Sequence, residues 1–340
     1  MQKAQIAGST LEYYAHLCKS VGLRKNDLIY PLLVSELNNG TTLSERNSMF
    51  GMVKIALKDV VQHVQKIIDQ GISSVIIFGN PAMRDLGASS ALRNDGIVQN
   101  STRKIKKEFG KLMTIITDVC ICQYNLTGHC GLQIKNRNGT KGTIDNDIDI
   151  DNDSTLDLLS KIAISHAESG ADIVAPSSMM DGQVVKIRSA LNDRGLRNVK
   201  IMAFSAKHAS SLYSPFRMAA YSKHFNNYPT IDKSTYQLGY GNPRQAIREV
   251  QTDIHEGADM ITIKPSLAYL DIVSMIRVNF DIPLVVHNVS GECAMIKAAA
   301  RNGWIDEEEW MVNSIASIKR AGARSIISYF TMDVAKYLDD

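Results

Sequence analysis

Ile201-Met-Ala-Phe-Ser-Ala-Lys207 is an apolar, strand-like run that ends on a charged side chain. A second run of the same kind, Met260-Ile-Thr-Ile-Lys264, also ends on a lysine, and a proline follows it. In a barrel of parallel strands the carboxyl ends of the strands converge on one mouth, where active sites of that architecture lie. The two runs therefore predict that Lys207 and Lys264 meet at one end of a barrel.

Two amines at close range have a characteristic chemistry. Each positive charge lowers the pKa of the other amine from about 10.4, so that one of them can be neutral and nucleophilic near pH 7. A neutral lysine that faces a ketone forms a Schiff base. The alternative is that a lysine after a strand only marks the exit of the chain to solvent, which explains one such lysine more easily than both.

The same pattern of a short apolar run, a turn and a longer helical segment repeats along the chain from Asp27. Glycines follow several of the helical segments, as a left-handed stop requires. The predicted strands are 28–34, 74–78, 113–118, 172–175, 200–205, 259–264, 283–288 and 325–329, and the clearest helices are 53–70, 155–169, 181–192, 243–255, 268–279 and 307–320.

Alternation of strands and helices indicates parallel pairing, and eight units indicate closure. We therefore predict an α/β fold, a (β/α)8 TIM barrel with an N-terminal arm. A doubly wound open sheet is the alternative, but it would want a glycine-rich phosphate turn after its first strand, which this sequence lacks.

Residues 1–26 form the predicted arm, and residues 27–340 form the catalytic barrel. Leu11, Tyr14 and Leu17 recur at helical spacing within the arm. The eight-unit repeat offers this apolar stripe no place, so we expect it to pack on a neighbouring copy in a homo-oligomer.

Composition excludes several classes of function. The chain has 340 residues, a net charge of +3 and 21% charged residues, with both signs interspersed. This balance gives no sign of a nucleic-acid or membrane partner. Because the sequence shows neither a membrane span nor a signal-peptide pattern, we expect a cytoplasmic protein.

Three long loops, 79–102, 120–154 and 213–243, follow predicted strands at the mouth, where long loops are usually functional. The acidic tract 145–153 looks like a calcium loop but lacks the glycine needed at its sixth position. We interpret it as a solvated loop, with Ser154 capping the next helix.

Cys120, Cys122 and Cys130 follow the third strand with the spacing C-x-C-x7-C. Three thiolates without a fourth protein ligand suit a zinc ion that keeps one position open for water or substrate. His129 is adjacent to a cysteine and is placed in the surroundings of the ion. The alternative is three buried, unligated thiols, which we disfavour because the loop is polar and offers no core to fill.

Other side chains at the predicted mouth are weaker candidates. Asp118 ends the third strand, where it can accept a proton or orient a ligand. Arg217 offers a two-pronged donor suited to a carboxylate, although such a residue is more often a surface ion-pair partner. Ser290 and Tyr329 carry hydroxyls able to hold a second carboxylate, or are ordinary polar residues at strand ends.

Together these residues resemble the porphobilinogen synthase family, also called δ-aminolevulinic acid dehydratases, from about Asp27 to the C-terminus. The motifs that carry the resemblance are Leu28-Ile-Tyr-Pro31, Asp118-Val-Cys-Ile-Cys122, Gly128-His-Cys-Gly131, Ala175-Pro-Ser-Ser-Met-Met-Asp-Gly182, Ser205-Ala-Lys207, Tyr213-Ser-Pro-Phe-Arg217, Lys264-Pro265 with Tyr269-Leu-Asp271, and Val289-Ser-Gly-Glu292.

The resemblance implies that two molecules of 5-aminolevulinate condense to porphobilinogen with loss of two waters. Lys264 and Lys207 would each hold one molecule as a Schiff base, in the P and A subsites respectively. It also implies a homo-octamer, zinc on the cysteine triad, and a Mg²⁺ ion at a second, non-catalytic site in some members. The residues implied to bind substrate carboxylates are Ser290 and Tyr329 on the P side and Arg217, Lys233 and Gln237 on the A side, and Asp118, Ser177 and Tyr213 would line the site.

Several positions depart from the family pattern. Lys233 stands where a second arginine is expected, so it keeps the charge but loses the planar fork. Ser214 replaces a glycine, His208 an aromatic residue and His287 a tyrosine. These departures leave two alternatives open: a divergent paralogue that uses two-lysine chemistry on another aminoketone, and a catalytically silent assembly protein.

Overall fold

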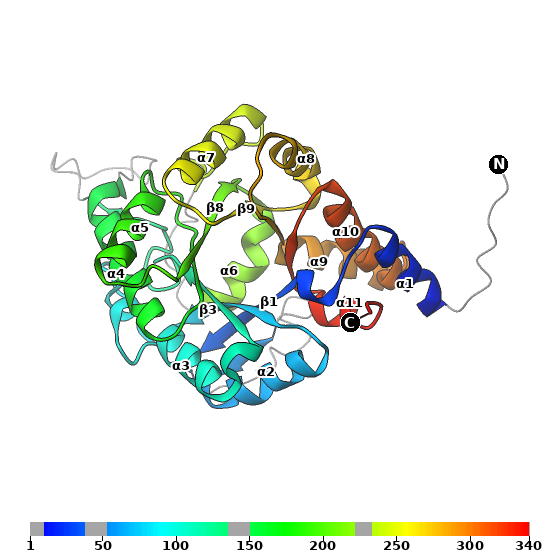
Figure 1. Cartoon of the computed structure of the whole chain (residues 1–340), viewed down its shortest axis with the longest axis horizontal. Helices are drawn as coiled ribbons and strands as arrows, with labels where there is room; N and C mark the ends of the chain where they lie inside the picture. Colours follow the sequence, from blue (N-terminus) through cyan, green and yellow to red (C-terminus); the bar gives the residue numbers. More distant parts are fainter. Residues whose placement is uncertain (1–9, 38–52, 135–149, 222–232, 340) are drawn as a thin grey trace.

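A computed structural model describes residues 10–37, 53–134, 150–221 and 233–339. Eight parallel strands form a closed barrel in which the last strand pairs with the first, and helices surround it (Figure 1). The predicted α/β barrel is confirmed. The barrel strands are β1 (Leu28–Ser35), β3 (Ser74–Asn80), β4 (Thr114–Val119), β7 (Ile173–Pro176), β8 (Lys200–Lys207), β9 (Met260–Lys264), β10 (Leu284–Asn288) and β11 (Ser325–Ser328).

The helices of the described chain surround the barrel or cover one of its ends. They are α1 (Thr10–Ser20), α2 (Val60–Asp69), α3 (Ile97–Phe109), α4 (Asn152–Glu168), α5 (Gln183–Asp193), α6 (Ser214–Tyr221), α7 (Pro243–His255), α8 (Leu270–Asn279), α9 (Ser290–Arg301), α10 (Glu307–Ala321) and α11 (Thr331–Ala335). Short 3₁₀ turns lie at Lys25–Asp27, Leu57–Asp59, Ser89–Leu92, Gly110–Leu112, Ser211–Tyr213 and Leu267–Tyr269.

Three predicted helix starts are wrong, each for a local reason. The predicted helix 53–70 begins as strand β2 (Lys54–Ala56), which pairs with β1 outside the barrel, so α2 starts only at Val60. The predicted helix 181–192 starts at Gln183, because Gly182 has a left-handed φ of 80°. Before α4 the capping residue is Asp151, whose carboxylate accepts the Ser154 N–H at 2.9 Å, so Ser154 is not the cap.

The predicted long loops contain more structure than their polar sequences suggest. The acidic tract lies mostly outside the described residues, but Ile150–Asp151 forms strand β6, which pairs antiparallel with β5 (Leu132–Gln133). Helix α3 begins inside the first long loop, and α6 lies inside the third. In Figure 1, α6 lies over the centre of the ring of strands, and it places Phe216 against the β3 residue Phe78, with ring centroids 5.2 Å apart. One end of the barrel is therefore covered.

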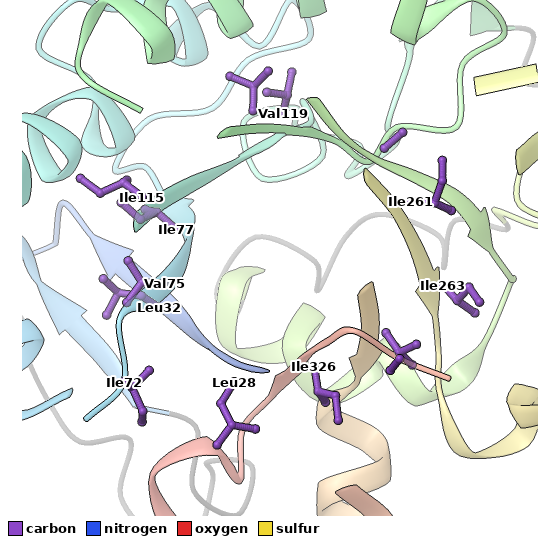
Figure 2. Packing of buried hydrophobic residues seen from close by; sticks show 14 of the residues in the cluster. Leu28, Leu32, Ile72, Val75, Ile77, Ile115, Val119, Ile261, Ile263 and Ile326 are labelled. Atoms are coloured by element: carbon purple, nitrogen blue, oxygen red, sulfur yellow. The ribbon is translucent and has the colours of Figure 1, made fainter. Parts of the chain in front are cut away.

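The core divides according to the two-residue period of the strands. Side chains such as Leu32, Val75 and Ile263 point outward and pack against the helices (Figure 2). Their neighbours, such as Leu33 and Phe204, form a separate buried cluster inside the barrel. Burying both faces of a parallel strand requires near-continuous apolar sequence, which is what the eight runs provide.

Helix α1 packs against α10 of its own chain. The Tyr14 hydroxyl lies 3.5 Å from a carboxylate oxygen of Asp306, and the Tyr14 ring meets the Tyr337 ring edge-on at 5.4 Å. Tyr14 is therefore buried, which corrects the expectation that the whole apolar stripe waits for a neighbouring copy. Leu11, by contrast, is 53% exposed. Among the described residues, no helix has the length and apolar character required to cross a membrane.

Candidate active site

Lys207 and Lys264 are direct neighbours at the ends of β8 and β9. The register of the two strands pairs Lys207 with Lys264, as the sequence predicted. Between Ala203 and Ala206, β8 contains one residue more than β9 opposite it. Such a bulge changes the side to which later residues point. Met202, before the irregularity, faces the interior, and Lys207 joins Lys264 after it.

Aromatic rings surround the amine of Lys264. Its Nζ lies 5.0 Å from the ring centroid of Tyr213, 5.6 Å from that of Phe204 and 6.0 Å from that of Phe216. Burial among these rings and the charge of Lys207 lower the pKa of Lys264 to about 7. Lys264 therefore has the properties of a neutral nucleophile near physiological pH.

Lys207 has the opposite environment. Its buried ammonium donates a hydrogen bond to the Ser177 carbonyl oxygen. Burial alone would lower the pKa of Lys207, but the thiol groups of the cysteine triad and the carboxylate of Asp118 outweigh that effect and raise it. The expected lowering of both pKa values is thus wrong for Lys207 and confirmed for Lys264.

Asp118 is a buried carboxyl that continues the inward-facing positions of β4. One oxygen accepts the Ser177 hydroxyl at 2.6 Å, and the other accepts the Gln123 amide at 3.1 Å. Burial raises the pKa of Asp118, against the effect of these hydrogen bonds and of the two lysines. A buried carboxyl held in this way is suited to exchange a proton with a neighbouring group.

The sulfur atoms of Cys120, Cys122 and Cys130 all lie within 4.8 Å of one another. The three side chains are buried, which contradicts the expectation of an exposed polar loop. Hydrogen bonds from Cys120 and Cys122 lower the pKa of the Cys130 thiol well below its usual value, whereas burial raises that of Cys120. Three converging thiols, one of them with a lowered pKa, fit a thiophilic cation such as zinc.

Two side chains contact the last cysteine of the triad or its neighbour. Tyr236 accepts the Cys130 N–H at its hydroxyl oxygen, 3.2 Å away, and its hydroxyl lies 3.2 Å from His129 Nδ1. The ammonium of Lys233 lies 3.4 Å from the Cys130 sulfur. The ammonium of Lys233 is therefore directed toward the cysteine triad.

Tyr213 connects the backbone that follows β8 with the backbone at the end of β9. Its hydroxyl donates to the carbonyl oxygens of His208 at 2.5 Å and Lys264 at 3.1 Å. The guanidinium carbon of Arg217 lies 5.5 Å from the centre of the Tyr213 ring. Arg217 is half-buried, with its guanidinium beside an aromatic ring.

The remaining predicted residues lie around the same mouth. Ser290 begins α9 and is buried, and its Oγ accepts the Phe216 N–H at 3.2 Å. Tyr329 follows β11 and is half-buried. Gln237 is buried, and within the described ranges no hydrogen-bond partner is seen for its Oε1 atom.

Two of the departures from the family pattern are also placed here. His208 stacks on Tyr269 with ring centroids 4.0 Å apart, and burial lowers its pKa to about 4. His287 lies between rings, 6.2 Å from the ring centroid of Phe204 and 6.5 Å from that of Tyr329. Burial and the two lysines lower the pKa of His287, so it is neutral.

Sequence reasoning missed several residues that complete the site. Gln123 orients Asp118, Tyr236 supports Cys130, and Phe216 covers Lys264. Phe216 lies within a quoted motif, but nothing in the sequence indicates that its ring reaches the amine. The signal that could have located the others is their position in the long loops at the mouth.

Comparison with known proteins identifies the relatives of this chain. The family model described as "Delta-aminolevulinic acid dehydratase" matches residues 8–337. A protein of that name from Staphylococcus epidermidis is 43% identical over 324 residues, covering 95% of this chain and 94% of its own length. The Staphylococcus aureus protein of the same name is 43% identical over 318 residues, covering 93% of each.

A solved structure resembles this chain over nearly its whole length. It is the delta-aminolevulinic acid dehydratase, or porphobilinogen synthase, of Toxoplasma gondii, in complex with the reaction product porphobilinogen. Its TM-score is 0.83 at 33% sequence identity, and the match covers 99% of this chain and 92% of the other.

Proposed function

This chain belongs to the delta-aminolevulinic acid dehydratase family, and on that premise we propose that it condenses two molecules of 5-aminolevulinate to porphobilinogen through two lysine Schiff bases. The observation that carries the proposal is the in-register pair of Lys207 and Lys264, with the pKa of Lys264 lowered to about 7. A catalytically silent assembly protein would need neither the paired lysines nor the lowered pKa of Lys264. The comparisons give no support to a different aminoketone as substrate.

Lys264 acts as the nucleophile of the P-side subsite. Its neutral amine attacks the ketone carbon of one substrate, and the resulting carbinolamine loses water, so that a C=N bond replaces the C=O bond. The rings of Tyr213, Phe204 and Phe216 exclude water from this step. Ser290 and Tyr329 hold the carboxylate of the same molecule.

Lys207 forms the second Schiff base, on the A side, and must first lose a proton. Asp118 is the group that can accept it, because burial raises its pKa and so increases its affinity for a proton, and Ser177 contacts both partners. Arg217, Lys233 and Gln237 bind the carboxylate of the A-side molecule. Tyr213 lines the boundary between the two subsites.

We propose zinc as the metal of the triad. Three buried sulfur atoms within 4.8 Å of one another fit a tetrahedral ion with one open position. When bound by Cys120, Cys122 and Cys130, zinc supplies a positive charge that polarises the A-side substrate or a water beside it. The described cysteines are all free thiols, and a reducing cytoplasm would keep them so.

We propose that a second, non-catalytic Mg²⁺ binds through its water shell in an acidic cavity beside α5 and α7, since among the described residues only the cysteine triad brings three ligand atoms together. Asp181, Glu249 and Glu256 line a cavity of about 650 Å³ that α5 and α7 border. Burial, Asp181 and Glu256 raise the pKa of Glu249, and the pKa of the neighbouring Asp253 rises to about 7. A hydrated divalent cation would relieve this repulsion. Added Mg²⁺ should then raise the rate of pyrrole formation by the wild-type enzyme and should not change the rate of the Glu249→Gln variant.

We also propose a homo-oligomer, with the octamer as the expected state and residues 1–26 as part of its interface. Large apolar side chains remain exposed on and beside the pair formed by α1 and α10. They are Leu11, Tyr13, Trp304 and Trp310. Removing them from water by contact with another copy would stabilise an assembly by about 25 cal/mol per Å² buried. Light scattering of the intact chain tests this, and a fully active monomer at micromolar concentration would contradict it.

Incubation with 5-aminolevulinate and detection of the pyrrole product test the proposed activity directly. The zinc-loaded wild-type protein should form the pyrrole, and the Lys264→Ala variant should not. If the loaded protein is folded and gives no pyrrole, the activity is assigned wrongly.

A further inference from the structure

A fully buried polar network lies beneath the P-side residues, and neither the motifs nor the chemistry above assigns it a role. Its members are Ser266, Asn288, Glu292 and Ser328, and each has 0% exposed surface. Burying a carboxylate and three polar side chains is unfavourable unless hydrogen bonds satisfy them. The position of each hydrogen bond therefore shows what the network holds in place.

Glu292 accepts hydrogen bonds from five donors. Its Oε1 atom accepts the backbone N–H groups of Ser266 at 3.0 Å and Leu267 at 2.5 Å, two and three residues after Lys264. Its Oε2 atom accepts the Val289 N–H at 2.7 Å, directly before Ser290. The same oxygen accepts the Ser266 hydroxyl at 2.9 Å and the Asn288 amide at 3.3 Å. A carboxylate accepts on both oxygens, whereas an amide accepts on only one, so glutamine cannot replace glutamate here.

The network continues to the backbone on both sides of Tyr329. The Asn288 Oδ1 atom accepts the Ser328 hydroxyl at 2.8 Å, and the Ser328 oxygen accepts the Phe330 N–H at 3.1 Å. Ser328 and Phe330 flank Tyr329. One chain of hydrogen bonds thus joins the backbone next to Lys264, Ser290 and Tyr329.

The other side of the Lys264 backbone is held independently. Its carbonyl oxygen accepts the His208 N–H at 2.8 Å and the Tyr213 hydroxyl at 3.1 Å. Gly291 lies directly against the backbone of Leu212, where a side chain would collide. The segment that carries Lys264 is therefore held from both sides, while no member of the network contacts Lys207.

We propose that Glu292 and Asn288 are positioning residues for the P-side Schiff base, which fix Lys264, Ser290 and Tyr329 relative to one another. This inference rests on the proposed function, because it assigns the effect to imine formation at Lys264. Helix capping explains only the Val289 hydrogen bond. It does not explain the hydrogen bonds that Ser266, Leu267 and Asn288 donate to Glu292.

The test compares two lysines within one protein. Zinc-loaded enzyme is mixed with 5-aminolevulinate and borohydride, and the reduced adducts on the Lys264 and Lys207 peptides are quantified by mass spectrometry over time. In Glu292→Gln, trapping at Lys264 should slow at least about tenfold, because small misplacements of a reacting group cost up to about 100-fold. The rate at Lys207 should change much less, because the hydrogen bonds of the network end at the backbone beside Lys264, Ser290 and Tyr329.

The matched control is Asp306→Asn. Asp306 caps α10 by accepting the Glu309 N–H at 2.7 Å, so the change is again from carboxylate to amide in a helix cap, but away from the mouth. In this variant, the imines at Lys264 and Lys207 should both be trapped at the wild-type rate. Should Glu292→Gln fail to fold, Ser266→Ala removes one donor, keeps the carboxylate and should slow Lys264 selectively by a smaller factor.

A second measurement needs no substrate. Reductive methylation with ¹³C-formaldehyde gives each lysine an NMR signal, and the Lys264 signal, identified by its loss in Lys264→Arg, should be shifted by the surrounding rings. Glu292→Gln should move it, and Asp306→Asn should not. An unmoved signal, or equal slowing of trapping at both lysines, overturns the positioning role. Absence of any lysine adduct in the wild type, with the signal still moved by Glu292→Gln, would instead reject the Schiff-base mechanism and keep the network as the support of Lys264.

Discussion

The Lys264 side and the Lys207 side of the barrel mouth place the same functional group in opposite environments. Around Lys264 are aromatic rings and a saturated hydrogen-bond network, and the pKa of its amine falls to about 7. Around Lys207 are three thiols, a carboxylate and a carbonyl oxygen, and its pKa rises. The strands are adjacent and in register, so the difference comes from the side chains that other strands and the covering loops bring to each side. Two equivalent strand ends are thereby given different reactivities.

The largest effect that can break this comparison is removal of the nucleophile. Lys264→Ala should lower kcat by at least about 10³-fold, because no other described amine lies in the aromatic surroundings of Lys264. The control is Lys200→Ala, at the exposed start of β8. Steady-state assays of pyrrole formation measure both, and activity of Lys264→Ala within tenfold of wild type would contradict the assignment.

The next effect concerns the triad on the Lys207 side. Replacing Cys120, Cys122 and Cys130 with alanine, or chelating the metal, should abolish turnover and leave the barrel folded, since the main core lies between the strands and helices. Metal analysis should give about one zinc per active site in the wild type. Cys18→Ala, in α1, serves as the control for loss of a buried thiol. A triple variant with full activity would remove zinc from the account.

A smaller effect should follow from the A-side cations. Arg217→Lys should raise KM about three- to tenfold, because a carboxylate loses a bidentate donor, with kcat changed less. Lys233→Arg should lower KM a few fold by restoring a second fork. Saturation curves give both values. If the two substitutions leave KM unchanged, neither residue binds the A-side carboxylate.

Much of the barrel could be predicted from sequence because its determinants are local. Each strand is a continuous apolar run, and glycines with positive φ, such as Gly71 and Gly170, end helices where they were expected. Strand ends also placed Lys264 and Asp118 at one mouth. Predictions failed where distant segments decide the outcome. Strand β2 forms because β1 offers it an edge, and Tyr14 is buried because α10 lies beside it.

The environments of the site residues were the least predictable part. The spacing of the cysteines indicated a metal site but not their burial under the loop that carries Tyr236. The proximity of two lysines predicted that both pKa values are lowered. The direction of the pKa shift of Lys207, however, depends on the cysteine triad, which lies in another loop. The bulge in β8 that turns Lys207 inward has no evident sequence signal.

The pH dependence of imine formation tests the central asymmetry most directly. Below its pKa an amine is protonated and cannot attack, so a lowered pKa makes it reactive at lower pH. Borohydride trapping in single turnovers, from pH 5.5 to 9.5, should give a Lys264 adduct whose rate rises with a midpoint near pH 7, where its pKa lies. The Lys207 adduct should rise only at higher pH. Superimposable profiles for the two lysines, or a Lys264 midpoint near the ordinary value of about 10.4, would contradict the account.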